Sequence, residues 1–143
     1  MAHSKTDCRL SGCPIAFTLD LIGDRWSLLI IRDMLFLGKQ YYGEFLESPE
    51  KIATNILAER LKRLEDNDII SKRPDPESQK KIIYEMTKKG LALIPMILEM
   101  ISWGAKHDPN TAAPPAFIRD LKRDKVKLAE DVLQTYLKRK RKG

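Results

Sequence analysis

A stripe of apolar residues between positions 53 and 64 constrains the fold of this chain more than any other feature of its sequence. Ala53, Leu57, Leu61 and Leu64 are spaced four, four and three residues apart, so they lie within a narrow arc of an α-helix. The residues between them are mostly polar or charged. The spacing predicts a helix that packs on a core through its leucine side and presents its other side to a partner.

The period changes where this helix ends. We expect the helix to start at Thr54 or Ala53, with threonine the better cap, and to end near Asn67, which tolerates the left-handed conformation. A dense turn signal follows at 74–78, and the β-branched and aromatic run at 82–86 has the length of a strand. The pattern predicts a β-hairpin, which must pack against helices because two strands alone are marginally stable.

Three helices are predicted before this point. Pro14 suits the first turn of a helix that ends at Gly23. Asp24 is a suitable N-cap for a second helix, which ends at Gly38. A third, short apolar set stops before Pro49, because the residue preceding a proline is pushed out of the helical region.

After the hairpin, Thr87 is predicted to cap a helix that continues through Leu91 to Trp103. This helix is apolar over a wide arc, so one small domain cannot cover it and a further surface is required. A linker rich in proline and small residues follows at 107–115. Terminal helical structure, broken at Asp124, completes the prediction.

The chain has 143 residues, a net charge of +6 and a sequence pI of about 9.3. Excess positive charge favours polyanions or acidic surfaces as partners, although many basic proteins never touch nucleic acid. Much of the excess lies at 138–142, which is interpreted as a disordered basic tail. The apolar runs are far shorter than the roughly 20 residues of a membrane span, and two cysteines are too few for a disulfide scaffold. A cytoplasmic protein with reduced thiols and no membrane contact is expected.

The order of elements indicates a mainly α fold with a small β-hairpin (α+β), namely a winged helix-turn-helix with flanking helices. The helix with the leucine stripe is the second helix of that unit and hence the recognition helix. Its polar side and the basic hairpin supply the candidate DNA contacts, which are Thr54, Asn55, Ala58, Glu59, Lys62, Arg63, Arg73, Lys80 and Lys81. Lysine and arginine around the hairpin loop can neutralise phosphates without reading sequence.

Each residue type on the recognition helix suits a particular contact. Asn55 can read adenine bidentately, and Lys62 or Arg63 can reach guanine or phosphate. Glu59 can accept a hydrogen bond from cytosine, or it can orient Arg63 one turn away. The alternative interpretation is a winged-helix protein-interaction module that does not bind DNA sequence-specifically.

An ordered set of motifs spans residues 13–106. They are Cys13-Pro14, GDRW at Gly23–Trp26, YGEF at Tyr42–Phe45, IATNILAERLKRLE at Ile52–Glu65, DIISKR at Asp68–Arg73, YEMTKKG at Tyr84–Gly90 and Trp103. As a set they resemble the HxlR family of bacterial regulators, which are relatives of the MarR type with a winged helix-turn-helix. The resemblance implies a homodimer that binds a pseudo-palindromic operator in double-stranded DNA and controls transcription, and we expect a repressor.

The resemblance also assigns roles outside the recognition helix. It implies a dimer interface built by the first helix and the helix after the wing, with Ile15, Leu19, Leu91, Ile94, Ile97, Leu98, Ile101 and Trp103 as candidates. The family usually has arginine and phenylalanine just before the YGEF segment, where this chain has Lys39, Gln40 and Tyr41. Lys39 is therefore the candidate cation at that phosphate-facing turn.

In several relatives the cysteine before the proline senses oxidants or electrophiles, and here that residue is Cys13. A helix N-terminus favours the reactive thiolate, which supports the assignment, while an idle thiol is the alternative. Cys8 is a weaker candidate for a resolving partner. The expected effector is an oxidant or a small molecule.

The predicted organisation has three parts: a flexible segment at 1–12, a winged helix-turn-helix domain with dimerisation helices at 13–107, and a linker with a basic helical extension at 108–143. His3, His107 and the two cysteines lack a known ligand spacing, so no metal is expected. The sequence shows no nucleophile–base pair or phosphate loop. We therefore expect neither an enzyme nor a cofactor.

Overall fold

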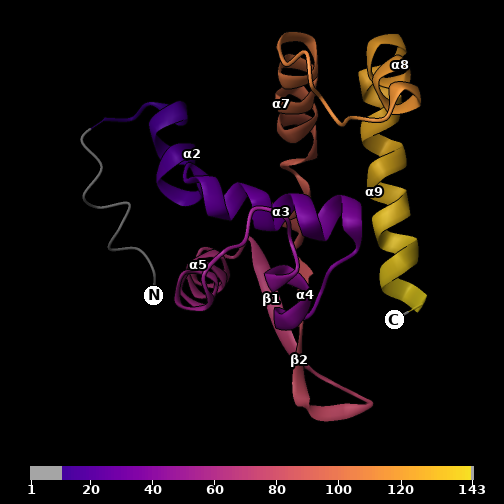
Figure 1. The fold of residues 1–143 in the computed structure, drawn as a ribbon. Coiled ribbons are helices and arrows are strands. Elements are labelled where there is room, and N and C mark those ends of the chain that lie inside the picture. Colours follow the sequence, from indigo (N-terminus) through magenta and orange to yellow (C-terminus); the bar gives the residue numbers. More distant parts are fainter. Residues whose placement is uncertain (1–10, 143) are drawn as a thin grey trace. The chain divides into compact units, whose positions relative to one another are not determined.

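The computed structural model describes residues 11–142 and is shown as a ribbon in Figure 1. Its elements are α2 (Pro14–Ile22), α3 (Arg25–Leu37), α4 (Tyr42–Leu46), α5 (Thr54–Asp66), β1 (Ile70–Asp75), β2 (Ser78–Met86), α6 (Lys88–Leu91), α7 (Ile94–His107), α8 (Pro115–Arg123) and α9 (Lys125–Lys142). The mainly helical fold with one antiparallel hairpin confirms the predicted fold class. Contacts within the chain divide it into a unit that ends at Gly90 and a unit at Leu91–Gly143.

The helices α2 and α3 begin and end where the sequence predicts. Gly23 ends α2, and a Cβ at this position would lie 2.4 Å from the carbonyl oxygen of Leu19. Asp24 caps α3 by accepting a hydrogen bond of 3.0 Å from the backbone N–H of Ser27. Gly38 ends α3 in the left-handed conformation, with φ of 68°.

Both ends of α5 differ from the prediction in detail. The N-cap is Ala53, and Thr54 is already the first helical residue, so the threonine does not act as the cap. Asn67 ends the helix as predicted, but its φ is −94°, and Asp68 is the residue with positive φ. The side-chain amide of Asn67 instead donates to the carbonyl oxygen of Arg63, which satisfies one of the open acceptors at the helix end.

The hairpin packs against the helices through α4 and α5. Its register pairs Ile70 with Met86 and Arg73 with Ile83, and only Pro76 and Glu77 remain between the strands. The predicted turn at 74–78 is therefore shorter than expected. The backbone N–H of Tyr84 donates to Gln40 at 2.8 Å, so the segment before α4 joins the outer edge of β2.

The core of this unit is lined by the apolar sides of the helices and the inner face of the hairpin. Its most deeply buried members are Ile31, Met34, Leu35, Phe45, Leu57, Leu61, Leu64, Ile70 and Met86. The leucine stripe of α5 is central to it, as the spacing predicts. This burial fixes which side of α5 is left facing outward.

The second unit contains α7, α8 and α9. The helix predicted to run from Thr87 through Trp103 is broken, because Pro95 lies in the first turn of α7 and cannot continue a preceding helix. Asp124 separates α8 from α9, as predicted, and accepts a hydrogen bond from the N–H of Lys127 at 3.0 Å. The basic run at 138–142 belongs to α9, so the interpretation of it as a disordered tail is wrong.

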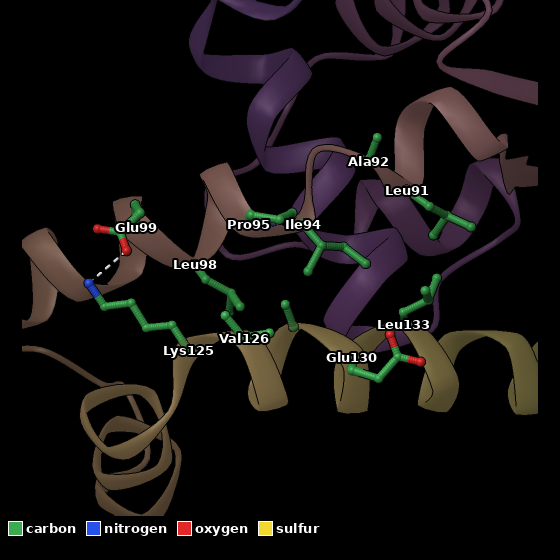
Figure 2. A pocket seen from close by; sticks show the side chains of 11 residues that line it. Leu91, Ala92, Ile94, Pro95, Leu98, Glu99, Lys125, Val126, Glu130 and Leu133 are labelled. Carbon is green, nitrogen blue, oxygen red and sulfur yellow. Dashed lines mark ion pairs between the residues drawn. The ribbon is translucent and has the colours of Figure 1, made fainter.

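An apolar pocket lies between α7 and α9. Figure 2 shows Ile94, Leu98 and Leu133 lining it, and an ion pair of 2.7 Å joins Glu99 to Lys125 beside it. Both C-terminal helices pack against α7. This packing places α7 with α8 and α9, whereas the predicted domain boundary lay after residue 107.

Candidate DNA-binding surface

The outward side of α5 is a continuous exposed surface. The side chains of Leu57, Leu61 and Leu64 are no more than 2% exposed, which fixes the orientation of the helix. The residues opposite them that are exposed are Thr54, Asn55, Ala58, Glu59 and Lys62. Lys62 makes an ion pair of 3.4 Å with Asp66 one turn along the same side. Five of the predicted contacts thus share one solvent-facing side.

Arg63 is not part of this surface, which corrects the prediction. Its guanidinium contacts the carboxylate of Asp24 at 2.5 Å, and Arg60 contacts the other oxygen of the same carboxylate at 2.7 Å. Glu59 pairs with Arg60 and not with Arg63, so the predicted one-turn pairing is also wrong. The physical reason is the N-cap of α3, where a carboxylate lies close to the flank of α5 and attracts both arginines.

Asp24 is therefore the residue that joins α3 to α5. Burial alone would raise the pKa of this carboxyl, but hydrogen bonds from Ser27 and Arg60 outweigh it and lower the pKa to about 2. The group is charged at neutral pH. Sequence analysis identified its capping role but not its two arginine partners, because that contact joins residues far apart in the chain.

Lys39 lies in a second ion-pair network and is not free for a phosphate. Its ammonium group lies 2.8 Å from the hydroxyl of Ser48 and 3.4 Å from the carboxylate of Asp33, which is 2% exposed. The prediction that Lys39 faces phosphate is thus contradicted. A buried carboxylate requires a cation, and Lys39 is within reach of it.

Arg32 completes this network. It bonds Asp33 at 2.8 Å and clamps Glu50 through two hydrogen bonds of 2.7 and 2.9 Å. The hydrogen bond from Arg32 lowers the pKa of Glu50 to about 2. Sequence analysis missed this pair, and the acidic residue in the middle of an apolar helix at position 33 was the available signal for a buried network.

The wing presents two kinds of basic residue. Lys80 and Lys81 are exposed near the hairpin turn, and the ammonium of Lys81 lies 5.4 Å from the ring centroid of Tyr41. Arg73 instead bonds Glu85 on the facing strand at 3.0 Å, so it is already paired. The two lysines are the better candidates for phosphate contacts on the wing.

Two tyrosines position the surface and were not identified as site residues from the sequence. The hydroxyl of Tyr42 donates to the backbone carbonyl of Thr54 at 2.8 Å, which holds the N-terminus of α5 against α4. The hydroxyl of Tyr41 donates to Asp75 at 2.8 Å at the end of β1. Tyr41 and Tyr42, at the start of α4, therefore connect that helix to the wing and to α5, respectively.

Cys13 lies at the N-cap of α2 and is exposed, with its thiol free. The N–H of Phe17 donates to the carbonyl oxygen of Cys13 at 3.0 Å, which makes the cysteine the boundary residue of the helix. This position agrees with the helix start predicted from Pro14. Cys8 and His3 lie outside the described residues.

The predicted dimer residues fall into two groups. Ile15, Leu19 and Trp103 are 70%, 58% and 69% exposed, so they are available to a partner. Leu91 and Ile101 are partly exposed. Ile94, Ile97 and Leu98 are buried within the chain itself, which contradicts their assignment to an interface. The packing of α8 and α9 on α7 removes much of the need for a partner there.

Within residues 11–142 no helix is long and apolar enough to span a membrane. No cluster of three or more histidine, cysteine, aspartate or glutamate side chains suitable for a metal ion occurs in the same part of the chain.

Comparison with known proteins identifies helix-turn-helix regulators. A family model described as HxlR-like helix-turn-helix matches residues 21–112. The HTH-type transcriptional regulator YodB of Bacillus subtilis (strain 168) is 40% identical over 92 residues, which cover 64% of this chain and 81% of YodB. The crystal structure of PA1607 is similar with a TM-score of 0.65 and 36% identity, covering 80% of this chain and 76% of that one.

Redox regulators are also among the similar structures. The redox regulator HypR in its oxidised form has a TM-score of 0.60 and 31% identity, with coverage of 66% of this chain and 97% of HypR. Diamide-treated YodB has a TM-score of 0.53, 36% identity and coverage of 69% and 97%. A quinone-bound form of YodB is similar to the same extent, with a TM-score of 0.54, 33% identity and coverage of 66% and 99%.

Proposed function

Because the chain belongs to the HxlR-like helix-turn-helix family and is a DNA-binding transcriptional regulator, not an enzyme, we propose that it binds a pseudo-palindromic operator as a homodimer. In this proposal it represses transcription in the bacterial cytoplasm, and α5 reads the major groove while the wing contacts phosphates. The observation that carries the proposal is the exposed side of α5. Its leucines are fully buried, so Asn55 and Lys62 face solvent together.

Asn55 is the residue proposed to carry most of the base preference. It lies in the first turn of α5, and the N-terminal half of a recognition helix contacts base edges. The small Ala58, one turn on, lets the helix approach the groove floor. Glu59 and Lys62 flank it, but each already has an ionic partner on α5, so they contribute less.

The test is a gel-shift titration on the upstream DNA of its own gene and on a scrambled duplex of equal length. Asn55→Ala is expected to lower the ratio of the two affinities by roughly 5- to 100-fold, the effect of losing one bidentate base contact. Asn110→Ala, an exposed asparagine in the segment between α7 and α8, is the control and should leave the ratio unchanged. Equal binding of both duplexes by the unchanged protein refutes sequence-specific recognition and favours a protein-interaction module.

The homodimer is proposed to use the exposed apolar residues Ile15, Leu19 and Trp103. Sedimentation equilibrium tests it with a matched pair of substitutions. Leu19→Lys should shift the protein to monomer, whereas Leu37→Lys should not, although both leucines are 58% exposed. Monomer from the unchanged protein at micromolar concentration contradicts the proposal, as does an equal effect of the two substitutions.

A second proposal is that Cys13 makes operator binding responsive to oxidants or quinone-type electrophiles. The exposed thiol at the start of α2 supports it, together with the similarity to HypR and YodB. Diamide or benzoquinone treatment is expected to change operator affinity in the unchanged protein. Cys13→Ser should abolish the change. Cys8→Ser tests whether the second cysteine takes part. A full response in Cys13→Ser refutes the assignment.

A further inference from the structure

The positive charge of this chain is concentrated at one end of one helix. Residues 138–142 are five consecutive lysines and arginines, while the net charge of the whole chain is +6. All other residues together therefore contribute a net charge of +1. A regulator that binds DNA obtains much of its affinity from cations that neutralise phosphates. This distribution makes the C-terminal end of α9 a candidate for phosphate contacts in addition to those of the winged unit.

Most cations of the winged unit already have carboxylate partners. The paired side chains are Arg32, Lys39, Arg60, Lys62, Arg63, Lys72 and Arg73. Contact with a phosphate would require several of these ion pairs to break or to be shared. Lys80 and Lys81 on the wing remain without a carboxylate partner among the ion pairs of the described residues. The paired cations are therefore less available to phosphates than Lys80 and Lys81, or than the exposed Arg25, Lys51, Lys88 and Lys89 elsewhere in the unit.

In the basic end of α9, five cations follow one another with no carboxylate between them. Lys138, Lys140 and Arg141 are exposed. The last carboxylate before them is that of Asp131, which pairs with Lys127 at 3.2 Å, and residues 132–143 contain no aspartate or glutamate. Cations at a helix C-terminus also complement the helix dipole, which explains one or two of them but not a run of five.

This end is held in a folded helix. Val132 and Tyr136 are buried, so α9 is anchored by packing just before the basic run, and the exposed Lys138, Lys140 and Arg141 belong to that helix. The same burial argues against a lipid surface. An interfacial helix needs a wide free apolar side to insert. Of the four apolar residues that precede the basic run, Val132 and Tyr136 are buried, and Leu133 and Leu137 are only partly exposed. The partner that best fits this run of cations is a nucleic-acid backbone, whose negative charges are regular and dense.

We propose that residues 138–142 of α9 bind the phosphate backbone of duplex DNA that flanks the operator, without reading its sequence. This inference rests on the proposed function, because α5 supplies the register on the operator. Since the two contacts belong to one chain, binding by α5 raises the local concentration of DNA for α9. The basic run lies outside the segment that matches the family model, which ends at residue 112.

The size of the effect follows from helix geometry. Residues three apart lie on the same side of a helix, so Lys138 and Arg141 can face one backbone together. Two phosphate contacts per protomer make four in the proposed homodimer, which correspond to a change of about 4 in the slope of log affinity against log salt. Affinity in 0.1 M salt is then expected to fall by roughly 100- to 10,000-fold when the cations are removed.

The experiment compares two full-length variants of equal charge. The first replaces Lys138, Arg139, Lys140, Arg141 and Lys142 by glutamine. The control replaces five exposed cations elsewhere in the same unit by glutamine: Lys106, Arg119, Lys122, Arg123 and Lys127. Circular dichroism and urea unfolding establish that both variants fold. Each protein is titrated with the operator core alone and with the core extended by about 15 random base pairs at each end, over a range of salt concentrations.

The unchanged protein should bind the extended duplex more tightly, and the α9 variant should lose that advantage together with about 4 in salt slope. Its ratio of operator to scrambled affinity should stay unchanged, whereas Asn55→Ala changes only that ratio. An unaltered slope in the α9 variant overturns the inference, as does an equal loss in the control variant. Loss of binding to anionic phospholipid vesicles, with DNA binding intact, also overturns it in favour of a membrane contact. Failure of the proposed function would give a different result: the unchanged protein would show no preference for the operator, but the longer duplex would still bind more tightly than the shorter one.

Discussion

Replacing Asp24 by asparagine tests whether ion pairs orient the recognition helix. Asp24 caps α3 through Ser27 and also bonds Arg60 and Arg63 on the flank of α5. Asparagine is as good an N-cap as aspartate, so Asp24→Asn keeps the cap and removes only the charge. The loss of stability then reports on the contact between the two helices.

The expected magnitude comes from the pKa of the carboxyl. A fall from the ordinary value of 3.8 to about 2 corresponds to roughly 2.5 kcal/mol of preference for the charged form, at about 1.4 kcal/mol per tenfold change. The Asp24 side chain is 25% exposed, so solvent screening reduces the contribution to about 1–2 kcal/mol. Two arginines left without their partner add to the cost and do not offset it.

Urea unfolding, followed by circular dichroism at several pH values, measures this contribution. The pKa is lower in the folded protein, so the stabilisation is fully present above about pH 4 and disappears as pH falls towards 2. The gap between the unchanged protein and Asp24→Asn should be about 1–2 kcal/mol at pH 7 and close to zero at pH 2. Asp20→Asn, an exposed carboxylate on α2, is the control and should change stability by less than about 0.5 kcal/mol.

Two results would refute the reasoning. Equal stability of Asp24→Asn and the unchanged protein at pH 7 would mean that the ion pairs contribute nothing beyond the cap. A gap that persists undiminished at pH 2 would mean that the loss arises from packing or capping and not from charge. Glu50 loses its charge in the same acidic range, so the comparison uses the difference between two proteins at each pH.

Four further predictions concern stability and DNA binding. Gly90→Ala should destabilise the protein by about 1–3 kcal/mol, because a Cβ there would lie 2.2 Å from the carbonyl oxygen of Ile69. Gly104→Ala, whose Cβ meets nothing within 4 Å, should stabilise α7 by about 0.5–1 kcal/mol, and thermal unfolding checks both. Lys39→Ala should lower the free energy of unfolding by about 0.5–1.5 kcal/mol, because it removes one of the two cations at the buried carboxylate of Asp33 and leaves Arg32 in place. It should leave the salt slope of DNA binding unchanged. Lys81→Ala should reduce the salt slope by about 2, one contact from each protomer of the proposed homodimer, with little effect on urea unfolding.

Local signals predicted the helices of the winged unit well because their ends are encoded within a few residues. Asp24 and Gly38 act where capping chemistry places them, and the leucine period fixes the buried side of α5. The break before α7 was also encoded locally, in Pro95, but the apolar period on both sides of it outweighed that signal. At the start of α5 a local signal misled the prediction, because Thr54 is a good capping residue but lies one position inside the helix.

The candidate surface was less predictable, because periodicity gives the direction of a side chain but not its partner. Thr54, Asn55, Ala58, Glu59 and Lys62 are exposed as the helical projection implies. The positions of Arg63 and Lys39 depend on carboxylates contributed by α3, and such long-range pairings leave no local pattern. The same limit applied to α7, whose apolar arc required a cover without indicating whether a second protomer or α9 would provide it.

The polar and charged residues of α5 have two different roles, which depend on their position around the helix. Arg60 and Arg63 lie on the flank and hold α5 to the capped start of α3, whereas Asn55 and Lys62 are exposed on the outer side. A recognition helix anchored through its own cations has few left for phosphates, so its exposed side is suited to reading bases and poorly suited to supplying affinity. Substitutions on the flank of α5 should therefore change the stability of the protein, whereas substitutions on its outer side should change its base preference. Salt dependence should then reside mainly in residues outside α5.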